Sequence, residues 1–339
     1  MLPRKLIYVY FVGTVLAIVW IYLNFASWCQ DNGDEYELEK KKVQIFQQKH
    51  ESQKSEIDVL KRRVDELNSE LRKAEIRLSH LKSESSGLPK IYLVTPTYSR
   101  PQQKAELTRL SHTLRHVPNI HWIIVEDSAA KTVLVSRFLT SCKIPYTHLN
   151  IATPGKLKLK EDDPNWLKPR GVYQRNAALD WIRKQPSNTG VVYFADDDNT
   201  YDLQLFEEMR FTKKVTVWPV GLVGYLWYES PVVRQGKVIG WYTFWKPERP
   251  FAMDMAGFAV NLSLFKDHPT AQFHTSAGRG NLESDLLTQL DITLSDLEPK
   301  ADKCTKVLVW HTRTEKPSLK NEEKMMRKYG YNSENILEV

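Results

Sequence analysis

Cysteine is scarce in this sequence, with Cys29, Cys142 and Cys304 the three found among 339 residues. Three thiols are too few for a disulfide framework, and none of them has the spacing of a metal-binding motif. A bridge between the Cys29 residues of two chains is one alternative, and free thiols throughout are the simpler interpretation. Internal repeats and low-complexity tracts are also lacking, so the sequence does not fit a repeat protein.

A recognition motif for nucleic acid is lacking as well, although the formal net charge is +7. The Lys and Arg residues are spread thinly and concentrate only in residues 39–82, a segment with a helical pattern of its own. Positive charge without a recognition module does not indicate nucleic-acid binding. We therefore expect no nucleic-acid partner.

One long uncharged apolar run is present, over residues 6–23. As a helix it is long enough to cross a hydrocarbon core of about 30 Å. Basic residues precede it and acidic residues follow it, so the positive-inside rule predicts a cytosolic stub over residues 1–5, a signal-anchor helix over residues 6–25 and a lumenal remainder. A cleaved signal peptide is the alternative, since Phe25-Ala26-Ser27 offers a weak cleavage pattern.

Residues 26–88 have the pattern of a stem, because proline is absent from residues 34–86 and apolar residues recur at alternating spacings of three and four. Such heptads, with β-branched residues at the first two a positions and mostly leucine at d, favour a parallel dimeric coiled coil over residues 57–81. The flanking charges are mixed, so the coil is expected to be weak, and a single solvated helix is the alternative. The a positions are Ile57, Val64, Leu71 and Leu78, and the d positions are Leu60, Leu67, Ala74 and Leu81.

Apolar strands alternate with helical segments from residue 91 to residue 195, which predicts a mostly parallel, doubly wound α/β sheet. From Val215 onward the sequence is β-rich and punctuated by glycine, which indicates a second half with mixed strands. We expect the halves to span residues 89–200 and 201–339. The expected strands begin at residues 91, 120, 146 and 191, and the expected helices cover about 101–116, 132–139 and 172–183.

Three carboxylates, Asp196, Asp197 and Asp198, directly follow the uncharged run 191–195. Ligands of α/β sheets gather at the carboxyl ends of strands, so this is where a site is expected. Adjacent carboxylates repel one another, and a hard divalent cation that bridges to phosphate oxygens would offset that cost. A solvated acidic loop is the alternative.

A series of motifs in the chain resembles the β-1,3-glucuronosyltransferases, which are type II Golgi glycosyltransferases. The resemblance extends from residue 91 to the end of the chain, with the motifs in the order of the family. They are Pro96-Thr97-Tyr98, Val125-Glu126-Asp127, Pro169-Arg170-Gly171-Val172, Gln174-Arg175-Asn176, Tyr193 to Thr200, Trp218 to Gly224, Arg249-Pro250-Phe251, Asp254 to Val260, Leu282-Glu283-Ser284 and Trp310 to Lys316.

The resemblance implies a GT-A-like nucleotide-sugar fold, Mn²⁺, a Golgi membrane location, a homodimer and inverting transfer of glucuronic acid from UDP-glucuronate to the 3-hydroxyl of a terminal galactose. Arg279-Gly280 and Trp245 favour the group that completes the glycosaminoglycan–protein linkage tetrasaccharide. Residues 228–231 and 260–262 instead lean towards the group that makes the HNK-1 epitope. A catalytically inactive lumenal binding protein is the alternative from another class.

Donor binding is expected from residues at strand ends and at the start of a helix. Asp198 would be the inner-sphere metal ligand, Tyr98 would stack on uracil, and Asp127 would accept from the uracil N–H or merely cap a helix. His311 and Arg313 are two apart after an apolar run, so a strand would project both to one face. The expected donor-binding residues are Pro96, Thr97, Tyr98, Asp127, Arg170, Arg175, Asp196, Asp197, Asp198, His311, Thr312 and Arg313.

Acceptor binding is expected from Trp245, Arg249, Asp254 and Glu229, with the indole of Trp245 under the apolar face of galactose. A tryptophan in the core is the alternative, since the chain has 10 tryptophans. Glu283 is the expected general base, and its alternative is a first-turn carboxylate that only stabilises a helix.

Overall fold

The computed structural model describes residues 12–21, 33–85, 87–159, 163–164 and 167–330, in two compact units, Met1–Leu81 and Lys82–Val339. Residues 12–21 are helical, and the rest of the predicted signal-anchor, including residues 6–11, lies outside these ranges. Within the described ranges, no helix has the length and apolar character needed to span a membrane. Cys142 and Cys304 are free thiols, whereas Cys29 lies outside the described ranges.

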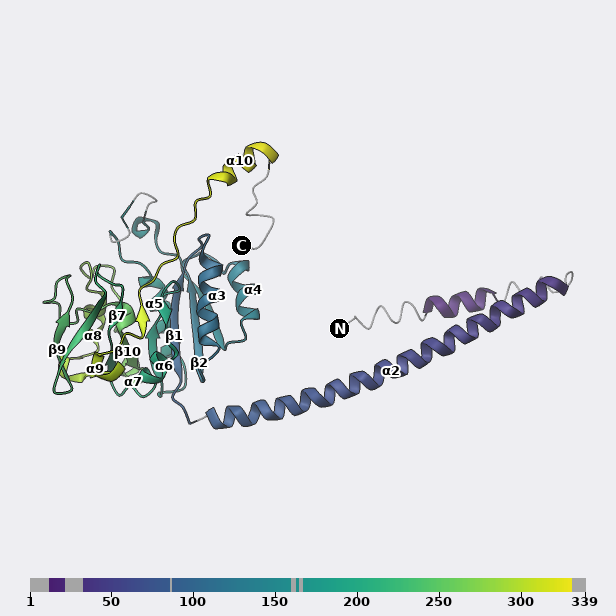
Figure 1. The fold of residues 1–339 in the computed structure, drawn as a ribbon, viewed down its shortest axis with the longest axis horizontal. Coiled ribbons are helices and arrows are strands. Elements are labelled where there is room, and N and C mark those ends of the chain that lie inside the picture. Colours follow the sequence, from purple (N-terminus) through teal and green to yellow (C-terminus); the bar gives the residue numbers. More distant parts are fainter. Residues whose placement is uncertain (1–11, 22–32, 86, 160–162, 165–166, 331–339) are drawn as a thin grey trace. The chain divides into compact units, whose positions relative to one another are not determined.

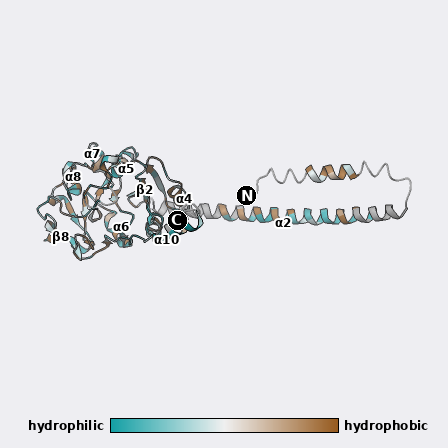
Figure 2. Cartoon of the chain, turned by 90° about the horizontal axis from the view of Figure 1, so that it is seen from above, coloured by the Kyte–Doolittle hydropathy of each residue, from teal (hydrophilic) through white to brown (hydrophobic). Residues whose placement is uncertain are grey.

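Helix α2 (Gly33–Ser85) runs without interruption through the predicted stem. Hydrophilic and hydrophobic residues alternate along it (Figure 2). Its heptad side chains from Ile57 to Leu71 are about half exposed, from 49% for Leu67 to 59% for Leu60. The predicted helix is therefore present, with an apolar stripe that a second helix would bury in a coiled coil.

The larger sheet of the second unit has seven strands in the order β11–β6–β10–β4–β1–β2–β3. Figure 1 labels β10, β1 and β2 of this sheet. Strands β4, β1, β2 and β3 are parallel neighbours, whereas β10 runs antiparallel to both β4 and β6. The predicted mixed α/β fold is therefore confirmed. The strands are β1 (Ile91–Thr97), β2 (Ile120–Glu126), β3 (Tyr146–Asn150), β4 (Val191–Phe194), β6 (Val215–Val217), β10 (Phe258–Asn261) and β11 (Leu297–Pro299).

Helices cover both faces of this sheet because apolar side chains alternate between two buried clusters. Tyr193 packs in one cluster with α3, α4 and α6, and Phe194 packs in the other with α5, α7 and α8. Period-two alternation of large apolar residues requires a core on each side of the strand. The helices are α3 (Gln103–Leu114), α4 (Val133–Ser141), α5 (Val172–Arg183), α6 (Leu203–Met209), α7 (Leu262–Asp267) and α8 (Leu282–Gln289).

A second sheet of five short strands has the order β5–β12–β7–β8–β9. Its strand β5 starts two residues after Asp198 and pairs with β12, so the chain near residue 310 returns to the same place. The strands are β5 (Thr200–Tyr201), β7 (Val220–Gly221), β8 (Tyr228–Arg234), β9 (Lys237–Tyr242) and β12 (Val309–Trp310). Short helical turns η1 (Gly155–Leu157), η2 (Met255–Gly257), η3 (Leu294–Asp296) and α9 (Ala301–Cys304), and the later helix α10 (Lys320–Tyr329), complete the unit.

Candidate active site

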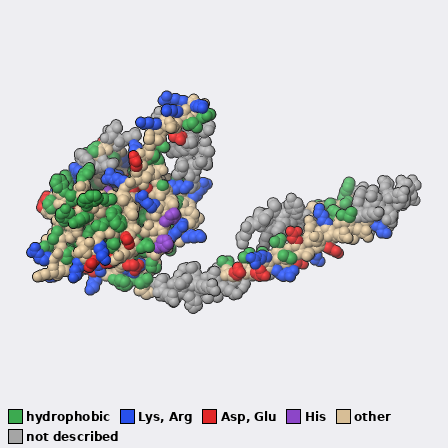
Figure 3. Space-filling view, viewed as in Figure 1, with side chains coloured by type: hydrophobic (Ala, Val, Ile, Leu, Met, Phe, Trp, Pro, Cys, Tyr) green, Lys and Arg blue, Asp and Glu red, His purple; other side chains and the backbone are tan. Residues whose placement is uncertain are grey.

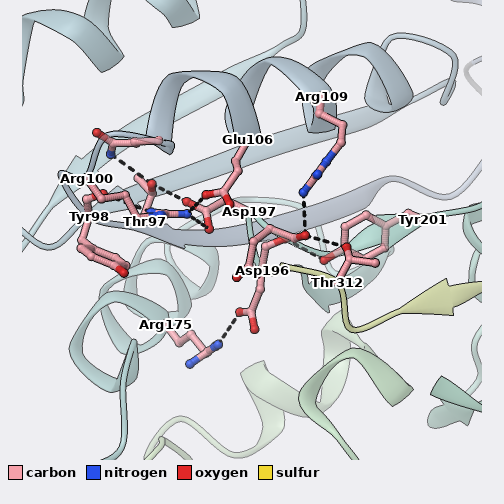
Figure 4. A network of polar contacts seen from close by, with 12 residues as sticks. Thr97, Tyr98, Arg100, Glu106, Arg109, Arg175, Asp196, Asp197, Tyr201 and Thr312 are labelled. Carbon is pink, nitrogen blue, oxygen red and sulfur yellow. Dashed lines mark hydrogen bonds and ion pairs between the residues drawn. The ribbon is translucent and has the colours of Figure 1, made fainter. Parts of the chain in front are cut away.

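The acidic triplet lies at the carboxyl end of β4, and each aspartate has different partners. Figure 4 labels Asp196 and Asp197 among these contacts. The carboxylate of Asp196 accepts a hydrogen bond of 2.7 Å from Arg175 on α5. The hydroxyl of Tyr201 donates to the backbone carbonyl of Asp196 at 2.8 Å. Arg175 is one of the predicted donor-binding residues, and here it neutralises the first aspartate of the triplet.

Asp197 is buried, and both of its carboxylate oxygens are occupied. One accepts from the hydroxyl of Thr97 and the other from the guanidinium of Arg100, each at 2.6 Å. Arg100 also pairs with Glu106 on α3, and its guanidinium carbon lies 4.5 Å from the centroid of the Tyr98 ring. Asp197 thus joins the ends of β1 and β4, while Arg100 covers one face of the ring predicted to stack on uracil.

Asp198 is held through its backbone, because its carbonyl accepts from Arg109 at 2.6 Å and from the hydroxyl of Thr312 at 2.8 Å. Among the contacts of the described residues, its carboxylate has no hydrogen-bond or ion-pair partner. Burial, followed by repulsion from Asp196 and Asp197, raises the pKa of this carboxyl to about 6. Of the three aspartates, Asp198 is the one whose carboxylate is not paired with an arginine among the described residues.

The residues fit a divalent cation that takes most of its ligands from a substrate. No group of three or more His, Cys, Asp or Glu side chains with metal-site geometry occurs among the described residues. Small hard cations are often bound by one or two carboxylates, water and substrate phosphate oxygens rather than by an all-protein cage. Asp198 would supply such a carboxylate, and its role as the metal ligand stays a prediction.

The predicted uracil-binding residues lie at the ends of β1 and β2. Tyr98 is 47% exposed, so its ring is accessible. The carboxylate of Asp127 accepts from the backbone N–H and hydroxyl of Thr153, at 2.7 Å and 2.8 Å, and does not cap α4, whose cap is Thr132. Asp127 therefore holds the loop after β3 against the end of β2, and the capping alternative is wrong.

The start of α5 approaches the end of β1 closely. Gly171 precedes the helix with φ +71°, and a Cβ there would lie 3.2 Å from the ring of Pro96 and 2.6 Å from the guanidinium of Arg175. A side chain at this position would therefore be both strained and clashing. Arg170, next to it, is exposed, and its carbonyl accepts from Arg175 at 2.9 Å.

Thr312 reaches the triplet from the C-terminal part of the chain, with His311 and Arg313 on either side of it in the sequence. The prediction that a strand carries His311 and Arg313 on one face is wrong, because β12 ends at Trp310. The backbone N–H of His311 instead donates to the carbonyl of Gly221, and its ring nitrogen Nδ1 lies 3.7 Å from Asp254. Thr312 contacts Asp198, as noted, and the side chain of Arg313 is exposed.

The predicted acceptor residues Trp245 and Arg249 lie against the turn that precedes α8. Arg249 donates to the carbonyls of Gly280 and Trp245, and the guanidinium carbon of Arg279 lies 4.4 Å from the Trp245 ring centroid. Trp245 is 37% exposed, so the core alternative for this tryptophan is wrong. Its indole is accessible beside two arginines.

Glu229 and Glu283 are both buried carboxylates near Asp254. Burial is the main cause that raises the pKa of each, and Asp254 raises both further. The hydroxyl of Thr243 donates a hydrogen bond to Glu229, which counteracts the rise in its pKa. For Glu283 the rise in pKa is counteracted only by a hydrogen bond from its own backbone and by the more distant charges of Arg249 and Arg175. The pKa of Glu283 rises to about 7, a value suited to a general base near neutral pH.

Three charged residues of the network were not predicted from the sequence, namely Arg100, Glu106 and Arg109. Glu106 and Arg109 are three apart on α3 and therefore share a face of that helix. A helix that follows a strand ending in a predicted donor site turns its first part towards that site, which is the signal that could have identified them. Arg100 follows the same strand end directly.

An α/β sheet with donor-type residues at its strand ends and a buried carboxylate beside them is typical of nucleotide-sugar glycosyltransferases. Residues 110–315 match the model of glycosyltransferase family 43, and the chain belongs to that family. It is 54% identical over 268 residues to galactosylgalactosylxylosylprotein 3-beta-glucuronosyltransferase 3 of Homo sapiens, covering 76% of this chain and 79% of that one.

The Homo sapiens enzyme numbered 1 under the same name is 57% identical over 246 residues, covering 71% of this chain and 73% of its own length. The solved structure of S. aureus TarS in complex with UDP-GlcNAc aligns at 16% identity with a TM-score of 0.42, over 67% of this chain and 59% of that one. This chain is accordingly a glycosyltransferase.

Proposed function

We propose that the chain transfers glucuronic acid from UDP-glucuronate, with inversion, to the 3-hydroxyl of the terminal galactose of galactosylgalactosylxylosylprotein. The names of its relatives support the transferred glucuronosyl group and the acceptor. One observation supports the chemistry. The buried carboxyl of Glu283, whose pKa is raised to about 7, lies within electrostatic range of Arg175 on the donor side and of Arg249 and Asp254 on the acceptor side. A base between donor and acceptor is what an inverting transfer requires.

The donor would bind across the carboxyl ends of β1, β2 and β4. The open face of Tyr98 would stack on uracil, and Asp127 would accept from its N–H. Asp198 would hold Mn²⁺, which when bound supplies positive charge beside the diphosphate. Arg170, His311 and Arg313 would add charge and hydrogen bonds to the phosphates, which stabilises the negative charge that develops as the diphosphate leaves.

The acceptor galactose would lie on Trp245, with its hydroxyls within reach of Arg249, Asp254 and Glu229. Glu283 would take the proton of the 3-hydroxyl as that oxygen forms a bond to C1 of glucuronic acid. The bond from C1 to the diphosphate oxygen breaks, and UDP leaves with the electron pair from the opposite face of the sugar. One proton moves to Glu283 and configuration at C1 inverts.

The setting of the reaction is part of the same proposal. A Golgi membrane protein of type II would have residues 1–5 in the cytosol, residues 6–25 in the bilayer and the catalytic unit in the lumen. A homodimer joined through the stem would then present two lumenal sites.

A direct test is to incubate the purified chain with UDP-glucuronate, Mn²⁺ and a galactosylgalactosylxylose acceptor, and to follow UDP release and the new linkage by mass spectrometry and NMR. We expect a glucuronic acid β-linked to galactose O3. Transfer only to an N-acetyllactosamine acceptor would assign the HNK-1-type reaction instead. Binding of UDP-glucuronate without transfer to either acceptor would leave the binding-protein alternative.

A further inference from the structure

Three polar side chains near the site bind a backbone residue in the same way, through both its N–H and its C=O. The hydroxyl of Ser284 accepts from the N–H of Phe251 and donates to its carbonyl, each at 3.1 Å. The amide of Gln289 accepts from the N–H of Gln272 at 3.1 Å and donates to its carbonyl at 2.9 Å. Each side chain thus forms the two backbone hydrogen bonds that a neighbouring strand would otherwise form.

Asn176 on α5 makes the third such pair, accepting from the N–H of Phe273 at 2.9 Å and donating to its carbonyl at 2.8 Å. The backbone residues concerned, Phe251, Gln272 and Phe273, lie in segments without helix or strand. Phe251 and Phe273 are buried, so their backbone groups would otherwise lack partners away from water. We call Asn176, Ser284 and Gln289 the clasp residues.

The clasp residues connect the elements that carry the proposed chemistry. Asn176 follows Arg175, which pairs with Asp196 of the triplet. Ser284 follows Glu283 on α8 and binds the segment that contains Arg249 and Asp254. The clasps therefore form one path: from donor helix α5 to residues 272–273, then through α8, and on to the acceptor segment around Phe251.

The segment 272–273 also touches the donor site directly. The ring of Phe273 lies 5.1 Å from that of Phe194, the last residue of β4, and 6.0 Å from the guanidinium carbon of Arg175. Packing of Phe273 thus fixes the segment 272–273 from the donor side, and the hydrogen bonds between Gln289 and Gln272 fix it from α8. A second link supports α8 here, since His274 pairs with Asp285 at 2.8 Å.

Glu283 depends on this framework for its position. Its carboxylate is bonded to its own backbone, and the other groups that influence it act at longer range. The direction of the carboxylate therefore follows the first turn of α8. A displacement of about 1 Å between reacting groups can lower a rate by about 10²-fold, so the placement of that turn matters for catalysis.

We infer that Asn176, Ser284 and Gln289 are positioning residues that fix the position of Glu283 between the donor helix α5 and the acceptor segment at Phe251. This inference rests on the proposed role of Glu283 as the base. Because the clasps act on geometry, their loss is expected to lower kcat while the dissociation constant for UDP in the presence of Mn²⁺ stays within about twofold.

The test uses the full chain with the substitutions Ser284→Ala, Gln289→Glu and Asn176→Asp. The last two keep size and the accepting oxygen but remove the N–H donor. Each should lower kcat by about 10–100-fold, by the scale of a small misplacement. Thr288→Ala, at the exposed neighbour of Gln289 on α8, is the matched control and should leave kcat unchanged. Thermal melts establish that each variant is folded at the assay temperature.

A double-variant comparison separates positioning from a general structural effect. In the Glu283→Gln background, Ser284→Ala should cost less than about threefold in kcat, because residues that act through one group are not additive. An equal loss in both backgrounds, or single variants with unchanged kcat, would overturn the inference while leaving the base in place. If Glu283→Gln alone keeps more than about a tenth of kcat, it is instead the proposed base that fails.

Discussion

Glu283 combines deep burial with a neighbouring carboxylate, Asp254, and both disfavour its ionised form. A carboxyl whose pKa is raised to about 7 in the folded chain, from a usual 4.5, contributes to stability fully below pH 4.5. That contribution is lost as the pH rises through 7, because the folded chain must then hold a buried charge. Activity has the opposite requirement, since the base must be ionised.

We therefore predict that Glu283→Gln raises the melting temperature at pH 8 and leaves it nearly unchanged at pH 4. The same variant should lower kcat by about 10²–10⁴-fold with UDP binding intact. Calorimetry at both pH values and single-turnover kinetics measure the two effects. Asp267→Asn, at an exposed carboxylate at the end of α7, is the control and should change neither. Equal stabilisation at pH 4 and pH 8 would contradict the raised pKa.

Asp198 differs from its two neighbours because Arg175 neutralises Asp196, and Arg100 neutralises Asp197. We predict that UDP binding requires a divalent cation and that Asp198→Asn abolishes this dependence together with activity. Titration calorimetry of UDP with Mn²⁺, and again after chelation, provides the measurement. Equal affinity under both conditions in the unaltered chain would exclude a metal at Asp198.

Arg100 lies between two buried carboxylates, Asp197 and Glu106. Removing it in Arg100→Ala would leave both charges uncompensated, which costs about 3–5 kcal/mol for a broken buried pair. We predict a lower midpoint of urea unfolding for Arg100→Ala and partial recovery when Glu106→Gln is added. If Glu106→Gln brings no recovery, the two carboxylates do not share this guanidinium in solution.

At the level of helices and strands, patterns within one segment could be predicted and contacts between segments could not. Helix α5 covers the residues expected from the sequence, because its own apolar periodicity defines it. Strand β8 was missed because its inward positions are Glu229 and Pro231, whereas Tyr228 and Val232 are exposed, which reverses the usual pattern.

The partners of the predicted site residues could not be predicted from the sequence either. Arg100 and Asp197 are 97 positions apart, and nothing local to either residue encodes that they pair. His311 and Arg313 were expected on a strand, but the ladder to β5 ends at Trp310 and His311 bonds to Gly221 instead. Sequence reasoning therefore identified residue types at strand ends, and the fold decided which charges neutralise one another.

The turn α9 (Ala301–Cys304) has an unusual backbone, since all four residues have positive φ, from 53° to 65°. None of them is glycine, although left-handed backbone costs other residues about 1–2 kcal/mol each. Backbone bonds stabilise it, such as that from Cys304 N–H to the Lys300 carbonyl at 2.7 Å. The turn leads the chain from β11 towards β12 and so to His311.

We predict that Lys303→Gly raises the free energy of unfolding by about 1 kcal/mol, because glycine removes the left-handed strain but costs some unfolded-state entropy. Lys303 is exposed, so no packing is lost. Lys306→Gly, three residues on and without positive φ, is the matched control and should destabilise. Urea unfolding of both variants measures the difference. A loss of stability in Lys303→Gly would mean that the turn is not left-handed in solution.

On the scale of the whole molecule, both units have apolar side chains exposed among the described residues. In the catalytic unit, hydrophobic side chains gather over β7–β9 (Figure 3). Tyr225, Trp227 and Phe244 are the most exposed of them, at 109%, 85% and 80%. Contiguous exposed apolar surface commonly marks an interaction site. For this reason the catalytic unit alone is not expected to be strictly monomeric.

The heptad stripe of α2 is an exposed apolar surface of the first unit, and it leads to the last prediction. We expect a fragment that begins at Asn32 to be a dimer and one that begins at Leu88 to dimerise more weakly, because only the first contains the a and d residues. Sedimentation velocity across a concentration series measures both dissociation constants. Leu67→Lys, at a d position that is 49% exposed in the single helix, should weaken the longer dimer to the level of the shorter fragment. Lys61→Glu, outside the a and d positions, should affect it far less, since exposed charge pairs contribute little. If the Asn32 fragment is a monomer at micromolar concentration, the heptad stripe of α2 does not pack against the same helix of a second copy.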